Sequence, residues 1–139
     1  MACISEPASD QLQIQWDLAN RNTRVCAEIY QPRKALQEIA TGVRLFCENS
    51  RCSYQYVAGS DNPADNSGYF FYLRVYALDG LGSVCIHVRY TNHRQLPYRQ
   101  TADFCIQTDS DAVLRLRDLL NDFSQQPHGP IHWCERVDS

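Results

Sequence analysis

The stretch Tyr69–Tyr90, YFFYLRVYALDGLGSVCIHVRY, predicts two antiparallel strands joined by a tight turn at Asp79 and Gly80. Apolar and polar residues alternate along both halves, and successive side chains of a strand point to opposite faces. One face carries residues suited to a core: Tyr69, Phe71, Leu73, Val75, Val84, Ile86 and Val88. The other carries Tyr72, Arg74, Tyr76, His87 and Arg89. The hairpin therefore predicts a half-buried sheet with arginine, tyrosine and histidine on its open face.

The rest of the chain supplies further strands and two helices. Alternation predicts strands at residues 11–18, 23–30 and 102–107, with weaker signals at residues 54–57 and 131–134. Apolar residues recur every three or four positions from Pro32 to about Asn49, which predicts a helix. A second helix is expected after Thr108, which forms a variant capping box with Asp111.

The order β-β-α-β-β-β-α predicts the fold class α+β. Short connections between consecutive strands favour an antiparallel sheet of five or six strands, with both helices packed on one face. A chain of 139 residues without an internal linker suits a single domain, 1–139. The first residues, MACISEPASDQLQ, lack a secretory pattern and no apolar run could cross a membrane, so we expect a cytoplasmic protein without membrane contact.

Charge and cysteine content limit the classes of partner and cofactor that we expect. A net charge of −3 argues against a nucleic-acid partner and favours a basic one. Seven cysteines, an odd number without a secretory signal, are expected to be reduced, with Cys26, Cys85 and Cys105 as apolar strand residues.

Zinc-type spacings occur at Cys47/Cys52 and His128/His132, but a chain with a full sheet and two helices does not need zinc to fold. We expect no metal and no cofactor.

Two sets of residues are candidates for function. The first surrounds the loops, where carboxylates and aromatic side chains could meet a basic partner: Tyr54, Tyr56, Asp61, Asp65 and Asp79. The second is the open sheet face with Tyr72, Arg74, Tyr76, His87 and Arg89. There, His87 beside Tyr76 and Arg89 could act as an acid or base. The same residue types also cover solvated or partner-binding sheet faces, which we favour over an enzyme.

The order of elements resembles that of small cytoplasmic immunity proteins of bacterial polymorphic-toxin and contact-dependent growth inhibition systems, particularly the WapI-like group. The segments that carry the resemblance are PRKALQEIATGVRLFCE, GYFFYLRVYALDGLGSVCIHVRY and ADFCIQTDSDAVLRLRDLL. The resemblance implies a protein without catalytic activity that binds a cognate toxin domain, often a nuclease, and occludes its active or substrate-binding site.

We expect such a protein to be a monomer or a weak homodimer. Three alternatives stay open: a small enzyme using His87, a dimeric regulatory or chaperone-like module, and a nucleic-acid binder with its arginines on the open sheet face.

Overall fold

The computed structural model describes residues 2–8, 11–49, 51–62, 64, 68–125 and 131–134. The elements are the strands β1 (Ala2–Ala8), β2 (Gln11–Ala19) and β3 (Arg24–Pro32), the helix α1 (Arg33–Glu48), the strands β4 (Tyr54–Gly59), β5 (Phe70–Ala77), β6 (Ser83–Thr91) and β7 (Thr101–Asp109), and the helix α2 (Ser110–Gln125). None of the helices in these ranges is long and apolar enough to span a membrane.

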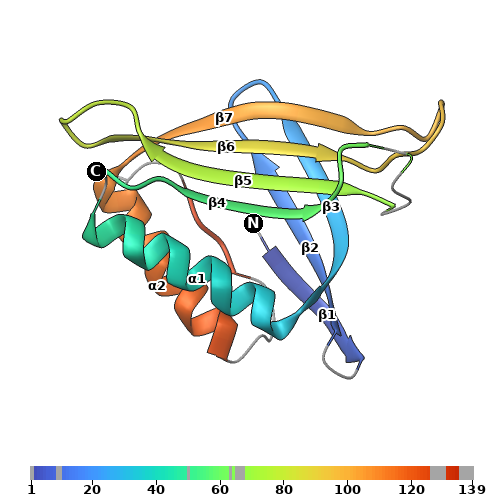
Figure 1. The fold of residues 1–139 in the computed structure, drawn as a ribbon, viewed down its shortest axis with the longest axis horizontal. Helices are drawn as coiled ribbons and strands as arrows, with labels where there is room; N and C mark the ends of the chain where they lie inside the picture. Colours follow the sequence, from blue (N-terminus) through green and yellow to red (C-terminus); the bar gives the residue numbers. More distant parts are fainter. Residues whose placement is uncertain are drawn as a thin grey trace.

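The strands form two antiparallel sheets, with the orders β1-β2-β3 and β4-β5-β6-β7. The α+β class is confirmed, whereas a single sheet was expected. The difference arises at Pro32, where β3 runs directly into α1. The helix carries the chain away from β3, and the next strand, β4, pairs with β5. Figure 1 shows both helices side by side against one face of the four-stranded sheet, with the three-stranded sheet at a steep angle to it.

The strand β1 was not predicted. Its sequence, ACISEPA, has no sustained alternation, and its pairing with β2 shifts register between Ile4 and Pro7. Proline lacks a backbone N–H, so it is confined to edge strands and irregularities such as this one. By contrast, the strand signal at residues 54–57 is confirmed as β4, and residues 131–134 make only a single bridge at Ile131.

The core lies between the two sheets and the helices. The inward set of the β5–β6 hairpin is buried as predicted, with Phe71 and Val88 fully enclosed, and Tyr69 is half-buried. The rings of Trp16 on β2 and Phe71 on β5 lie 5.3 Å apart, so the sheets meet through their apolar faces. The apolar stripes of both helices cover the same core.

A buried amide also joins the sheets. Gln31 on β3 is 1% exposed, and its Oε1 accepts a hydrogen bond of 2.8 Å from the indole N–H of Trp16. Its Nε2 donates to the Tyr56 hydroxyl on β4 at 2.7 Å. Because buried polar groups must be paired, this chain of hydrogen bonds fixes how the two sheets meet.

The helix boundaries follow local chemistry. Helix α1 ends at Glu48 and is capped by Asn49, as expected. Helix α2 is capped by Asp109, whose Oδ1 accepts a hydrogen bond of 2.8 Å from the N–H of Ala112. The capping box predicted at Thr108 is therefore wrong by one residue, because Thr108 has the inward parity of β7 and is buried.

Candidate functional site

The outer face of the four-stranded sheet brings together the second set of candidate residues. Strand pairing places Tyr72 opposite Arg89 and Arg74 opposite His87, and Tyr76 lies opposite Cys85. All are partly exposed apart from Cys85, which is buried beneath its neighbours. The predicted row is therefore present as one continuous patch on the side of the sheet that faces away from the helices.

Asp103 on β7, which the sequence interpretation did not name, is the acidic centre of this patch. Its Oδ1 lies 2.6 Å from His87 Nε2, and its Oδ2 lies 3.7 Å from Arg89 Nε. Asp103 shares the outward parity of Gln107 on the same strand, opposite to the inward Phe104 and Ile106. That signal was readable in the sequence, but only the pairing of β6 with β7 identifies the two partners.

Aromatic rings hold the arginines of the patch in place. The Arg89 guanidinium carbon lies 5.3 Å from the ring centre of Phe70 and 5.7 Å from that of Tyr72. The Arg74 guanidinium carbon lies 4.7 Å from the Tyr76 ring, and the His87 ring meets Tyr72 edge to face. Such cation–π and aromatic contacts reduce the freedom of long side chains, so a partner would meet a pre-formed surface.

A polar cleft continues the patch at the end of β6 and β7. It has a volume of about 560 Å³, and Arg89 and Asp103 belong to both the patch and the cleft. Further lining residues are Asp61, Phe70, Tyr90, Thr91, His93, Arg94, Gln95, Arg99, Thr101 and Ala102. Among the described lining residues, three arginines and two aspartates thus face one hollow.

The loop between β6 and β7, residues 92–100, forms one wall of the cleft and is braced by Asn92. The Asn92 Oδ1 accepts hydrogen bonds from the backbone N–H groups of Arg94 and Gln100, at 3.1 and 3.0 Å. Its Nδ2 donates to the carbonyl of Tyr98 at 2.9 Å. This braced loop exposes two large side chains, Leu96 at 73% and Tyr98 at 69%. Sequence reasoning missed both, since periodicity carries no signal in a loop.

The first set of candidates is dispersed. Tyr54 and Tyr56 lie on the predicted strand β4, and their half-buried rings pack against the core instead of facing a partner beside the loops. Asp61 is exposed and lines the cleft. Asp79 organises the β5–β6 turn, because its Oδ1 accepts a hydrogen bond of 2.8 Å from the N–H of Leu81. Asp65 lies outside the described residues. Of the described members of this set, only Asp61 is joined to the sheet patch, through the cleft that Arg89 and Asp103 also line.

The cysteines show no activated thiol among those with a resolved pKa shift. Burial raises the pKa of Cys85 to about 11, and burial also raises the pKa values of Cys47 and Cys26. A hydrogen bond with Cys85 raises the pKa of Tyr76 to about 12. Reactive cysteines require a lowered pKa, so these thiols remain protonated at neutral pH. Cys26 and Cys105 are exposed on outer faces, contrary to the expected apolar role.

The zinc-type spacings are not brought together in the described part of the chain. Cys47 is half-buried on α1, with its Sγ 4.0 Å from the carbonyl oxygen of Val113, and Cys52 is exposed. His128 lies outside the described residues. Within those residues, no three His, Cys, Asp or Glu side chains gather as metal ligands would.

Comparison with solved structures finds proteins of similar fold. The fold is similar to that of a chain in the CdiA-CT/CdiI toxin and immunity complex from Enterobacter cloacae, with a TM-score of 0.50. The match covers 88% of this chain and 98% of that chain at 13% sequence identity. No protein-family model and no curated protein matches the sequence. At this identity, the likeness establishes a shared fold.

Proposed function

We propose that this chain is an immunity protein that binds a cognate toxin domain and blocks its active or substrate-binding site. The observation that carries the proposal is the fold likeness to a chain of a toxin and immunity complex, which spans nearly the full length of both chains. The toxin would be a nuclease met in the cytoplasm, and the resemblance to the WapI-like group belongs to the same proposal. The protein would act as a monomer or weak homodimer.

The surface on the four-stranded sheet supports a protein partner. Arginine and tyrosine are the residue types that dominate binding energy at interfaces, and here Arg89 and Tyr72 are already held in mutual contact. The exposed Leu96 and Tyr98 sit on a braced loop beside them. Ordering this surface on binding would therefore cost little conformational entropy.

The charge of this surface defines the partner further. Although the whole chain has a net charge of −3, the described residues that line the cleft include three arginines against two aspartates. This face therefore does not suit the basic partner that the net charge predicted. We infer that the contacting region of the toxin carries carboxylates around an apolar hollow that accepts Tyr98.

The test uses the C-terminal domain encoded in the adjacent upstream reading frame. Co-expression with this chain should restore growth to cells poisoned by that domain, and the purified pair should form a complex. Tyr98→Ala and Arg94→Glu should each weaken binding at least about tenfold, as expected for central interface residues. Tyr30→Ala and Arg44→Glu are matched controls on exposed positions of β3 and α1.

Unchanged affinity in both Tyr98→Ala and Arg94→Glu, or equal losses in the controls, would reject this surface. Failure of the upstream domain to bind the wild-type chain would reject the immunity function itself.

A second candidate is a small enzyme that uses His87. It rests on one observation, the 2.6 Å contact between His87 Nε2 and Asp103 Oδ1, which could orient the imidazole for proton transfer. The two functions differ in what His87→Ala does. If the protein acts by occlusion, a His87→Ala variant that still binds the toxin still protects the cell. If the variant binds the toxin but no longer protects the cell, catalysis by His87 is favoured.

A further inference from the structure

A separate, apolar cavity lies inside the fold, away from the outer sheet face. It has a volume of about 310 Å³ and is bounded by both sheets, both helices and the segment 131–134. Its lining residues are Trp16, Asp17, Leu18, Ala19, Arg24, Ile39, Val43, Tyr54, Leu73, Val75, Ile86, Ile106, Leu116, Leu120 and Trp133. Protein cores leave few voids larger than a water molecule, so a hollow of this size is a distinct feature of the fold.

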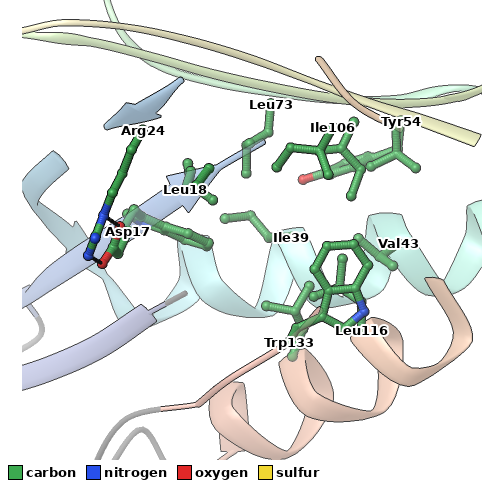
Figure 2. A pocket seen from close by; sticks show the side chains of 15 residues that line it. Asp17, Leu18, Arg24, Ile39, Val43, Tyr54, Leu73, Ile106, Leu116 and Trp133 are labelled. Carbon is green, nitrogen blue, oxygen red and sulfur yellow. Dashed lines mark hydrogen bonds and ion pairs between the residues drawn. The ribbon is translucent and has the colours of Figure 1, made fainter. Parts of the chain in front are cut away.

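The lining is mostly apolar, and the charges of its described residues cancel. Among the described residues that line the cavity, Asp17 and Arg24 are the charged ones, and they pair with each other at one end (Figure 2) through a hydrogen bond of 2.9 Å from Nε to Oδ1. The Arg24 side chain is 73% exposed, so this end reaches the surface. Both indole N–H groups are also occupied, that of Trp16 by Gln31 and that of Trp133 by the carbonyl of Ala112.

Among the described residues that line the cavity, Tyr54 has the hydroxyl that is left to bind a ligand. The Tyr54 ring packs directly on α1 at Gly42, where an added Cβ would overlap with the ring. Figure 2 shows the hydroxyl pointing inward among the lining side chains. None of the residues that the structure describes forms a hydrogen bond with it. Burial raises the pKa of Tyr54 well above its ordinary value, so the hydroxyl keeps its proton and can donate.

We propose that this cavity binds an uncharged small molecule with an aromatic or short aliphatic body and one hydrogen-bond acceptor, and that this acceptor takes a hydrogen bond from the Tyr54 hydroxyl. Apolar cavities of about 150 Å³ bind benzene, and ligand pockets begin at about 300 Å³, so one substituted ring fits this volume. The paired Asp17 and Arg24 leave no net charge for an ionic ligand. The site does not depend on the proposed immunity function.

The chain carries its own reporter for this site. Both of its two tryptophans, Trp16 and Trp133, line the cavity, so ligand entry should change the intrinsic fluorescence. The probes are acetophenone, an aromatic ketone, and ethylbenzene, which has a similar shape without the acceptor. Acetophenone should give a saturable fluorescence change and raise the melting temperature, because a ligand that binds only the folded state stabilises it. Ethylbenzene should bind more weakly.

Two kinds of variant test the role of the Tyr54 hydroxyl and the role of the cavity volume separately. Tyr54→Phe should weaken acetophenone about tenfold and leave ethylbenzene unchanged, the effect of losing one hydrogen bond. Tyr56→Phe is the matched control, since its hydroxyl binds Gln31 and does not line the cavity. Leu116→Phe should fill the space and abolish binding of both probes, with retained folding checked by circular dichroism.

The proposal is overturned if the wild-type protein shows no saturable change with acetophenone. It is also overturned if Tyr54→Phe and Tyr56→Phe affect acetophenone equally, or if a folded Leu116→Phe variant binds as well as the wild type. All of these measurements use the chain alone, so they do not depend on whether a toxin partner exists.

Discussion

Replacing Gln31 with leucine should destabilise the protein by breaking the polar link between its sheets. The substitution removes both hydrogen bonds of the amide but keeps similar volume, so little cavity is created. The Trp16 indole is 3% exposed and would lose its acceptor without gaining water. An unpaired buried donor costs about 1–3 kcal/mol, whereas the half-buried Tyr56 hydroxyl can turn to solvent at little cost.

The expected loss for Gln31→Leu is therefore about 2 kcal/mol in the free energy of unfolding. For a domain of this size, that corresponds to a fall in melting temperature of about 7 °C. Urea unfolding followed by tryptophan fluorescence measures the free energy of unfolding, and thermal unfolding followed by far-ultraviolet circular dichroism measures the melting temperature. Tyr56→Phe, which leaves the amide with one partner, should cost about 1 kcal/mol.

The double variant decides whether the three groups act as a chain. If they do, Gln31→Leu combined with Tyr56→Phe costs less than the sum of the single effects, because the second change has no bond left to remove. Additive losses, or a Gln31→Leu variant within about 0.5 kcal/mol of the wild type, would refute the idea that this amide joins the sheets.

Three further predictions concern a cap, a helix contact and alkaline pH. Asp109→Ala should lower stability by about 1 kcal/mol in urea unfolding, and Asp109→Asn, which keeps the capping acceptor, should lose much less. Gly42→Ala should cost about 1–2 kcal/mol despite its better helix propensity, because the new Cβ meets the Tyr54 ring; a neutral or stabilising result would contradict that packing. Burial raises the pKa values of Tyr54, Tyr56 and Tyr90, so the folded state keeps phenolic protons that the unfolded chain loses. Stability should be complete below about pH 10 and fall as pH rises above it, measured as the urea midpoint, with a shallower fall in Tyr54→Phe.

The chemistry of individual segments was readable from the sequence because it depends on neighbours in the chain. Alternation from Phe70 to Tyr90 identified two strands and correctly divided their inward and outward residues. The apolar periodicity after Pro32 located α1 to within a residue of its ends. These are local properties, since side-chain direction in a strand or helix repeats with a fixed period.

The tertiary structure decided which segments meet. Alternation along β3 shows that one of its faces is buried but not which strand lies beside it, so two sheets could not be distinguished from one. The same limit applied to the candidate site. Asp103 has readable outward parity, but its contact with His87 exists only through the register of β6 and β7. Tyr54, grouped from the sequence with the carboxylates around the loops, instead points its hydroxyl into a cavity bounded by segments far apart in the sequence. Local patterns specify what each element can bury, and only packing in three dimensions specifies against what.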